Sequence, residues 1–365
     1  MPTVNIDREQ LYQALGREYT TDEFRELCFE FGIELEEDTS AKEMAVRMGA
    51  KVEGNEQLSE RPVLKIDIPA NRYDLLCFEG ISRALNVYLG RTAVPTYRSV
   101  APAGCPLERV VVRSETATVR PFIACAILRN VRFTQASYDS FIDLQEKLHQ
   151  NICRKRTLAS IGTHDLDTIQ GPFTYEAVAP KDICFVPLNQ TREVTGDGLM
   201  DFYEHDKHLG RYLHIIRDAP RYPVVYDQSR RVCSLPPIIN GEHSKITLNT
   251  RNVFIECTAT DLTKAKIVVN TVVAMFSQYC QEPFTVEPVE VEMPDGQVTV
   301  FPDMKPIRMV GHLDYINSAI GVQLSSDQIV NYLNRMSLPA ALATESASTN
   351  EVLVDVPVTR SDILH

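Results

Sequence analysis

Polar side chains that could bind a ligand gather in one short corner of the sequence, between two apolar, strand-like stretches. The corner consists of five consecutive residues: Asn240, Gly241, Glu242, His243 and Ser244. Pro236 and Pro237 stiffen the approach to it, and the glycine permits the close approach of another molecule. Polar groups between buried strands are expected either to satisfy one another or to meet a ligand.

Two interpretations of this corner stay open from the residues alone. Arg231, on a neighbouring predicted strand, could bring a positive charge to the same cleft as Glu242 and so complete a binding site. The alternative is a solvated turn in which Ser244 caps the backbone, as serines commonly do in turns. The residue types by themselves do not choose between the two.

A second group of candidate ligands lies in the motif GTHDLDT, where His164, Asp165 and Asp167 are close together in sequence. Such a group suits a metal loop or an acid–base pair. No second cluster of ligands accompanies it, so we expect an Asx-type turn between strands and no metal site.

Two charged motifs also have structural explanations. Arg72, at a strand-to-helix corner, could contact a phosphate or carboxylate of a ligand. The favoured interpretation is an ion pair with Asp74, which would cap a helix that begins there, because it explains both residues without a ligand. The run from Arg154 to Arg156 follows a predicted helix, and cations suit the C-terminal end of a helix dipole. As a footprint for RNA this run is a weak signal.

The familiar catalytic and phosphate-binding motifs are missing from the sequence. It has no Gly-x-x-x-x-Gly-Lys-Ser/Thr loop, no Gly-x-Gly-x-x-Gly, no His-Glu-x-x-His and no Gly-x-Ser-x-Gly. We therefore expect no ATP chemistry and no bound cofactor in this chain.

Composition narrows the class of protein. The net charge of −12 argues against a chain that wraps nucleic acid by overall charge, although a local basic face is compatible with it. Nine cysteines are scattered without a Cys-x-x-Cys pair, which favours a reducing, cytoplasmic compartment. No apolar signal core or membrane-length apolar run occurs, so neither secretion nor membrane spanning is indicated.

Patterns along the chain predict a multidomain α+β protein without an internal repeat. We expect a small α+β domain over residues 1–95, a mixed domain with antiparallel sheets and two helices over 108–285, and a third domain over 286–365. The third domain should begin with a hairpin whose turn is Asp295-Gly296. Thr20 with Glu23 and Ser325 with Gln328 have the spacing of capping boxes.

Several stretches together resemble the β subunit of cytosolic phenylalanyl-tRNA synthetase of the archaeal and eukaryotic type. They are DIPANRYDLLCFEGISRAL, RPFIACAILRNVRF, SIGTHDLDTIQGPFTYEA, YLHIIRDAPRYPVVYD, PPIINGEHSKITLNTRNVFIECTATDLTKAKIVV and VPVTRSDILH. The resemblance is colinear from the first residue to the last. In this family the β subunit continues further, into regions that bind the α subunit, so we expect a portion of a longer protein.

The resemblance implies an N-terminal domain, a domain that edits mischarged tRNA and the start of a winged-helix-like domain. It implies tRNA(Phe) and the α subunit as partners in an α2β2 enzyme, with ATP and magnesium used by the α subunit. Carried onto this sequence, the editing pocket has Glu242 and Ser244 at its floor, Arg231 beside it, and Asn240 and Gly241 in its wall. His243 stands at a position that varies in the family.

Editing would hydrolyse tyrosine esterified to tRNA(Phe), with Glu242 accepting a hydrogen bond from the phenol and Arg231 orienting the tRNA end. An aminoacyl ester is already activated, so a positioned water and fixed donors suffice, and the general base stays open. The competing hypothesis is a tRNA-binding scaffold with an inactive pocket. The polar set Arg231, Glu242 and Ser244 favours the active pocket, because an inactive one would be free to fill with apolar residues.

We expect the 365-residue chain by itself to form no Phe-tRNA from phenylalanine, ATP and tRNA, because it lacks a phosphate-binding loop. Incorporation of labelled phenylalanine into tRNA measures this, with the two-subunit enzyme as the positive control. Net synthesis of Phe-tRNA by the chain alone would contradict the expectation.

Overall fold

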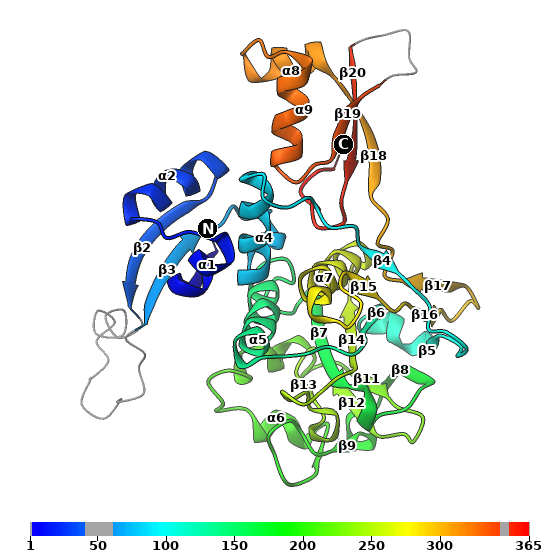
Figure 1. Ribbon diagram of the computed structural model, residues 1–365. Coiled ribbons are helices and arrows are strands. Elements are labelled where there is room, and N and C mark those ends of the chain that lie inside the picture. The colour runs from blue at the N-terminus through cyan, green and yellow to red at the C-terminus, as the bar shows by residue number, and fades with distance from the viewer. Residues whose placement is uncertain (1, 41–60, 344–349, 365) are drawn as a thin grey trace. The chain divides into compact units, whose positions relative to one another are not determined.

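The structure, a computed structural model, describes residues 2–40, 61–343 and 350–364 (Figure 1). These residues divide into two compact units. Unit 1 combines Met1–Pro95 with Pro306–His365, and unit 2 is Thr96–Lys305. The first and last parts of the chain therefore belong to one body, although they lie far apart in the sequence.

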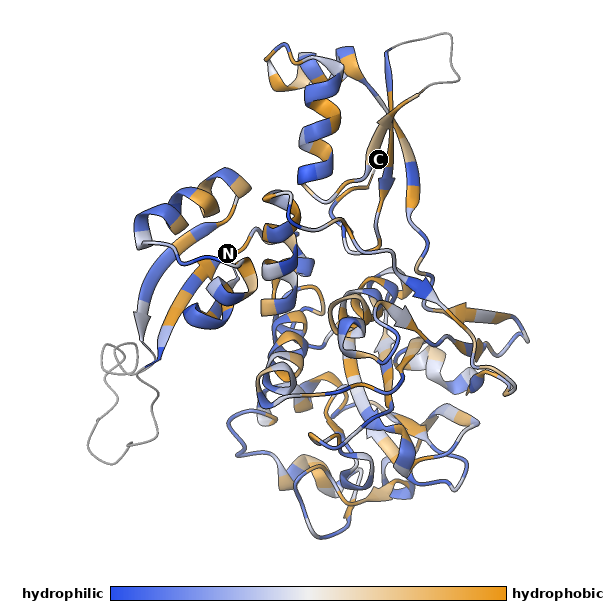
Figure 2. Cartoon of the chain, in the orientation of Figure 1, coloured by the Kyte–Doolittle hydropathy of each residue, from blue (hydrophilic) through white to orange (hydrophobic). Residues whose placement is uncertain are grey.

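Among the described residues, the N-terminal part of unit 1 is a small antiparallel sheet with three helices, and its strand order is β1-β3-β2. Its elements are β1 (Thr3–Asp7), α1 (Arg8–Leu15), α2 (Thr21–Phe31), β2 (Glu34–Ser40), β3 (Pro62–Asp67) and α4 (Phe78–Tyr88). The apolar face of α2 buries Phe24, Leu27 and Phe31. In Figure 2 this helix accordingly alternates hydrophilic and hydrophobic residues, as an amphipathic surface helix does.

A local signal predicted the start of α2 correctly, but the predicted start of α4 was wrong. The capping box of Thr20 and Glu23 is present, and Gly32 closes the helix with a φ of 93°. Asp74 does not cap a helix, because it lies in a short 3-10 turn at Tyr73–Leu75 and α4 begins at Phe78. Its carboxylate is instead held by the Arg72 guanidinium, as predicted, at 2.8 and 2.9 Å.

Unit 1 contains a short repeat that the sequence analysis missed. The pattern Asp-x-Pro-x-x-Arg-x-Asp occurs at residues 67–74 and again at 355–362, beginning at the end of a strand in both cases. The second copy repeats the arginine–aspartate fork between Arg360 and Asp362 at the same distances, 2.8 and 2.9 Å. Burial raises the pKa of Asp362, but Arg360 and Arg72 together bring it below its ordinary value. The two forks therefore interact electrostatically.

The C-terminal part of unit 1 is a second antiparallel sheet with two helices, and its strand order is β18-β20-β19. Its elements are β18 (Ile307–His312), α8 (Leu313–Ile320), α9 (Ser326–Arg335), β19 (Ala340–Leu342) and β20 (Glu351–Val356). The predicted capping box of Ser325 and Gln328 starts α9. At the other end of α9, Arg335 lies 4.1 Å from the ring of Tyr88 and donates to its carbonyl oxygen, which joins this part to α4.

Unit 2 is built on two larger sheets. The first is antiparallel and has the order β6-β14-β7, from β6 (Phe122–Leu128), β14 (Val253–Ala259) and β7 (Ala159–Asp165). The second has the order β13-β12-β11-β8-β5-β16-β17, from β13 (Ile239–Asn240), β12 (Val232–Leu235), β11 (Tyr222–Tyr226), β8 (Phe173–Val178), β5 (Glu108–Val112), β16 (Val289–Glu292) and β17 (Val298–Phe301). Helix α7 (Leu262–Phe276) packs on β6 and β14, and α5 (Gln135–Gln150) packs on α7 and β7.

Short elements complete unit 2. They are β4 (Arg98–Ser99), β9 (Cys184–Phe185), β10 (Val194–Thr195), α6 (Gly198–Phe202) and β15 (Thr285–Val286). The strands β9 and β10 form one small antiparallel pair, while β4 and β15 form a parallel one.

The mixed α+β, multidomain character predicted from the sequence is confirmed, with three corrections. The seven-stranded sheet is not purely antiparallel, because β5 pairs in parallel with both β8 and β16. The predicted hairpin β16–β17 exists, but residues 293–297 close it, with Gly296 at a φ of 83°. The sequence analysis assigned this hairpin to the third domain, whereas its pairing with β5 places it in unit 2.

Substitution Asp74→Ala should destabilise unit 1 strongly, because it leaves the buried Arg72 guanidinium, 10% exposed, without its partner. An uncompensated buried charge costs about 3–5 kcal/mol. Hydrogen exchange of the α4 amides measures the change in free energy of unfolding. The matched control is Asp355→Ala, which breaks an ion pair with the 69% exposed Arg308 and should leave this free energy nearly unchanged. Equal losses in the two variants would contradict the assignment.

Candidate functional site

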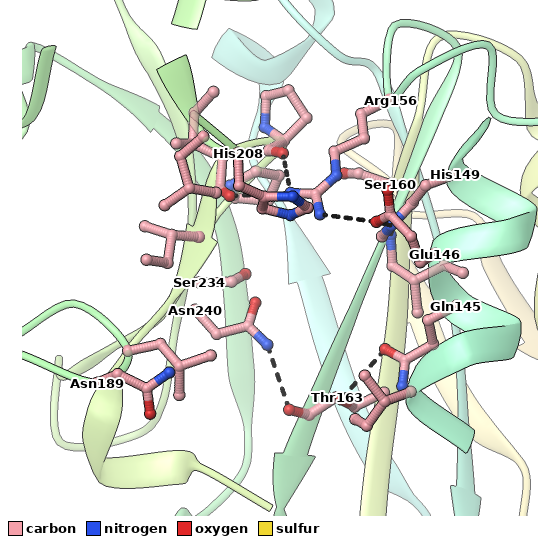
Figure 3. A pocket seen from close by; sticks show the side chains of 18 of the residues that line it. Gln145, Glu146, His149, Arg156, Ser160, Thr163, Asn189, His208, Ser234 and Asn240 are labelled. Carbon is pink, nitrogen blue, oxygen red and sulfur yellow. Dashed lines mark hydrogen bonds and ion pairs between the residues drawn. The ribbon is translucent and has the colours of Figure 1, made fainter. Parts of the chain in front are cut away.

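A cavity of about 880 Å³ lies in unit 2, beside the antiparallel sheet. Residues of α5 form one side, and residues of the turn near Asn189 and of the segment from Ser234 to Asn240 form the facing side (Figure 3). Ser160, Ile161 and Thr163 of β7 and Glu256 of β14 also belong to the lining. Its volume is near the upper end of the roughly 300–1,000 Å³ of typical ligand pockets.

The chemically most unusual group on the lining is the carboxylate of Glu256. It belongs to the central strand of its sheet and is 1% exposed. One carboxylate oxygen, Oε1, accepts a hydrogen bond of 2.7 Å from the Ser234 hydroxyl. The other, Oε2, is buried and has no hydrogen-bond partner among the residues that the structure describes. Since a buried carboxylate normally has its acceptor capacity filled, this oxygen is free to bind a donor from a ligand.

A glycine makes room for this carboxylate. Gly162 stands directly opposite Glu256 on the neighbouring strand β7. A Cβ atom at position 162 would lie 2.2 Å from Glu256 Oε1 and 3.1 Å from His164 Nε2. The absence of a side chain is therefore what allows Glu256 to fold over the β7 backbone.

Buried polar side chains connect the Glu256 carboxylate with the polar corner at residues 240–244. His164 has no exposed surface, and its Nε2 lies 3.9 Å from Glu256 Oε1. Its Nδ1 forms a hydrogen bond of 2.8 Å with the hydroxyl of Ser244, which is fully buried as well. Ser244 thus connects to the cavity through His164 and does not line it.

Of the five residues that were assigned to the pocket from the sequence, Asn240 lies on the cavity lining. Its side-chain amide donates to the Thr163 carbonyl oxygen at 3.3 Å, which ties the segment after β12 to β7 (Figure 3). The predicted wall residue therefore both faces the cavity and holds its two sides together.

Glu242 supports the wall from outside. Its carboxylate accepts a hydrogen bond from the backbone N–H of Asn189, a lining residue. Lys245 lies 3.9 Å from the same carboxylate and donates to the Asn189 side chain at 2.6 Å. Glu242 is absent from the lining itself, so this arrangement anchors the turn that forms the wall.

Arg231 clamps a hairpin. Its guanidinium contacts the buried Asp227 carboxylate at 2.8 Å and donates to the Thr168 carbonyl oxygen at 2.8 Å. The predicted close approach at Gly241 is to the protein's own backbone, because a Cβ there would lie 2.4 Å from the Val232 carbonyl oxygen. Burial lowers the pKa of the neighbouring His243, with a further contribution from Arg231.

The structure also shows the conformation of the two remaining motifs, GTHDLDT and the basic run from Arg154 to Arg156. The predicted Asx-type turn is confirmed, since the Asp165 carboxylate accepts from the Asp167 backbone N–H at 3.1 Å. The basic run does not end a helix: its three residues have positive φ angles of 46°, 52° and 67°, after α5 has ended at Gln150. This left-handed turn brings Arg156 onto the cavity lining, while Arg154 stays exposed.

Sequence reasoning missed the buried carboxylate, its neighbours Ser234 and Gly162, and the lining residue His149. Glu256 did carry a usable signal, because it is the one charged residue inside the otherwise uncharged strand VFIECTA. A charge at such a position must be paired or functional. Gly162 carried no such signal, because the need for a glycine there depends on which residue lies opposite it on the neighbouring strand.

Comparisons with known proteins show which family the chain resembles. Three family descriptions match successive parts of the chain: "Phe-tRNA synthetase beta subunit B1 domain" at residues 1–91, "B3/4 domain" at 125–281 and "tRNA synthetase B5 domain" at 310–365. The cavity-lining residues all fall inside the B3/4 match. The phenylalanine–tRNA ligase beta subunit of Homo sapiens is 51% identical over 368 residues, and that of Dictyostelium discoideum is 54% identical over 372.

The chain belongs to the phenylalanine–tRNA ligase β-subunit family. The resemblance read from its sequence is thereby confirmed. A crystal structure of an N-terminal fragment of the phenylalanyl-tRNA synthetase β-subunit from Pyrococcus horikoshii agrees with this, with a TM-score of 0.84 and 27% identity. That likeness covers 100% of this chain and 96% of the fragment.

This β-subunit chain corresponds to the N-terminal portion of its relatives. The matches cover 100% of the chain but 61% of the human relative and 59% of the Dictyostelium one. Within the described residues, no helix is long and apolar enough to cross a membrane.

Substitution Gly162→Ala should destabilise unit 2 by about 1–3 kcal/mol, because the new methyl group collides with the Glu256 carboxylate. The cost should fall when Glu256→Ala is combined with it, since the collision is then removed. Hydrogen exchange of the β14 amides in the single and double variants measures the coupling. An identical cost in both backgrounds would contradict the proposed role of this glycine.

Proposed function

We propose that this chain is the proofreading part of a phenylalanine–tRNA ligase and hydrolyses tyrosine that has been esterified to tRNA(Phe) by mistake. The observation that carries the proposal is the unpartnered Oε2 of Glu256, buried on the wall of the cavity in the B3/4 domain. A ligand that brings a hydroxyl donor to this oxygen satisfies it, whereas a ligand without one leaves it unpaired.

This property matches the discrimination that the ligase needs. An apolar site for phenylalanine cannot strongly reject a ligand that merely adds a hydroxyl, so tyrosine enters at a rate that needs correction. A second site that reads the hydroxyl solves the problem, because a buried acceptor left unpaired costs about 1–3 kcal/mol. Glu256 is a suitable acceptor for the phenol, since Ser234 occupies its other oxygen.

Hydrolysis of the ester needs few catalytic groups from the protein. Water adds to the ester carbonyl carbon, and the ribose hydroxyl of the tRNA leaves with a proton. The lining offers neutral polar groups for orienting that water, including Ser234, Ser160 and Asn240. No covalent enzyme intermediate is needed, because the ester is already activated and correct placement supplies much of the rate.

The residues chosen from the sequence then have two kinds of role. Asn240 contacts the substrate from the wall. Glu242 and Ser244 act as positioning residues, through Asn189 and His164 respectively. Arg231 holds the hairpin beside them. The alternative in which Glu242 itself reads the phenol makes a different prediction, which the experiment below separates.

The rest of the assignment follows from the family. The α subunit carries amino-acid activation with ATP and magnesium, and two copies of each subunit form an α2β2 enzyme that binds tRNA(Phe) in the cytoplasm. The Arabidopsis thaliana relative, which is 50% identical, is named a cytoplasmic phenylalanine–tRNA ligase beta subunit. The part at Pro306–His365 serves as a winged-helix-like module, in keeping with its order of strand, two helices and hairpin.

In the complete two-subunit enzyme, Glu256→Ala should slow hydrolysis of Tyr-tRNA(Phe) by about 5- to 150-fold, which corresponds to the loss of about 1–3 kcal/mol. Phe-tRNA(Phe) synthesis should continue, because it occurs in the α subunit. Deacylation of purified Tyr-tRNA(Phe) and Phe-tRNA(Phe) measures both effects.

The companion variant is Glu242→Ala. If it abolishes the preference for tyrosine while Glu256→Ala does not, Glu242 is the recognition carboxylate, as the sequence alone suggested. If the unsubstituted enzyme does not clear Tyr-tRNA(Phe) at all, the chain is a scaffold with an inactive pocket.

A further inference from the structure

One end of the cavity carries a buried positive charge that is only partly neutralised. Arg156 lines the cavity with a side chain that is 13% exposed. Its Nη1 donates to the carbonyl oxygens of Pro237 and Ile238, and the guanidinium lies 4.4 Å from the ring centre of Tyr212. Its Nε–H is buried without a hydrogen-bond partner among the described residues. A guanidinium in this state has donor capacity left for a ligand.

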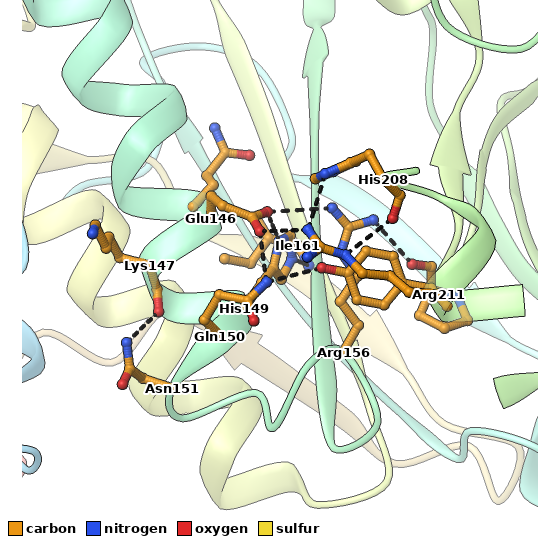
Figure 4. Close-up of polar contacts among 12 residues, drawn as sticks. Glu146, Lys147, His149, Gln150, Asn151, Arg156, Ile161, His208 and Arg211 are labelled. Atoms are coloured by element: carbon orange, nitrogen blue, oxygen red, sulfur yellow. Dashed lines mark hydrogen bonds and ion pairs between the residues drawn. The ribbon is translucent and has the colours of Figure 1, made fainter. Parts of the chain in front are cut away.

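A charge count around Arg156 gives an excess of positive charge (Figure 4). The Glu146 carboxylate lies 3.7 Å from Arg156 and 3.4 Å from Arg211, so one carboxylate serves two guanidinium groups. Both guanidinium groups stay protonated, as arginine does throughout proteins. The formal sum of these three groups is one positive charge.

Neither histidine in the cluster changes this count. His149 accepts the Ile161 backbone N–H at its Nε2, and burial, with Arg156 as the next cause, holds its pKa well below the ordinary value. His149 is therefore neutral. His208 accepts from Arg211 at Nδ1, at 3.0 Å, so its ring proton is on Nε2 and is available for donation.

Besides Glu256, the other carboxylates of the lining either accept hydrogen bonds from backbone N–H groups or lie several residues away along α5. Asp206 is bound by the backbone N–H groups of His208 and Leu209. Asp143 and Asp139 precede His149 on α5 by six and ten residues, which corresponds to about 9 and 15 Å along the helix axis. The cavity is thus acidic along part of α5 and basic at the end where Arg156 enters.

We propose that Arg156, with Arg211 and His208 beside it, binds a phosphate group, so that the cavity takes the aminoacyl ester of a 5′-phosphorylated nucleoside. The inference rests on the proposed function, which supplies an ester on a nucleic-acid end. A planar guanidinium suits a phosphate because it offers parallel N–H donors to two oxygens. The phosphate also supplies the negative charge that the cluster lacks.

The cavity size agrees with this assignment. At about 880 Å³ it has room for a nucleoside in addition to an amino-acid side chain. With the phosphate at Arg156, the ester extends toward Ser234 and Glu256, where the phenol is read. The two ends therefore recognise two different chemical groups of one substrate.

The test uses two stable analogues and the 365-residue chain. Both carry tyrosine in amide linkage on 3′-amino-3′-deoxyadenosine, and one of them also has a 5′-phosphate. Calorimetry measures their dissociation constants. The unsubstituted chain should bind the phosphorylated analogue at least 10-fold more tightly. The variant Arg156→Gln should reduce this preference to less than about 2-fold.

Two further variants keep the test decisive. Arg154→Gln removes one charge two residues away, at an exposed side chain, and should retain the full preference. Arg211→Gln removes a charge from a guanidinium that is 48% exposed, and should reduce the preference at least 3-fold even if Arg156→Gln impairs folding.

Equal affinities for the two analogues in the unsubstituted chain, or a preference that survives in both the Arg156 and Arg211 variants, would overturn the phosphate assignment. In those cases hydrolysis of Tyr-tRNA(Phe) by the complete enzyme would still stand. If neither analogue binds and Tyr-tRNA(Phe) is not cleared, the proposed function fails and the phosphate assignment fails with it.

Discussion

The site in unit 2 depends on keeping one carboxylate, that of Glu256, out of water in the middle of a sheet. Removing a charged group from water costs several kcal/mol unless other groups compensate. Here the compensation is incomplete, because Ser234 donates a hydrogen bond to one carboxylate oxygen and no described residue donates to the other. Gly162 supplies the space and His164 lies close behind. The surrounding fold must therefore be rigid enough to hold these groups in place without supplying a hydrogen-bond donor to the second carboxylate oxygen.

A second buried charge gives that rigidity. Arg120 is 1% exposed and has no carboxylate partner in hydrogen-bond contact among the described residues. It donates to the hydroxyl and carbonyl oxygens of Thr258, two residues beyond the cavity carboxylate on β14. It also donates to the carbonyl oxygens of Arg156 and Thr157. A single guanidinium thus links the strand that presents the carboxylate to the left-handed turn that presents the cation.

Unit 1 uses arginine–aspartate pairing in a different way. Each of its two parts has a strand that is followed within two residues by a proline, and then a fork in which an arginine holds the aspartate two residues later. The fork fixes the corner after the strand, and Arg335 on Tyr88 adds a contact between the parts. The two copies belong to chain segments that the whole of unit 2 separates in the sequence. Unit 2, which contains the cavity, is therefore an insertion between the two halves of unit 1.

The amino-acid sequence by itself determined the features that depend on neighbours within a few residues. The capping boxes at Thr20 and Ser325, the Asx-type turn at Asp165 and the Arg72–Asp74 pair form as expected, because each is closed by a hydrogen bond over two or three positions. The colinear resemblance to the family was readable for a related reason: it needs residue order and no coordinates.

Tertiary structure alone decided which polar groups meet at the cavity. Gly162, His164, Ser234 and Glu256 come together because β7 and β14 are neighbours in one sheet and β12 lies beside them, pairings that no local pattern specifies. The same holds for the parallel pairing of β5 and for the partners of Glu242 and Arg231, whose charges looked free in sequence. The energy of a buried charge depends on groups far along the chain, and so its role becomes visible only once the sheets have formed.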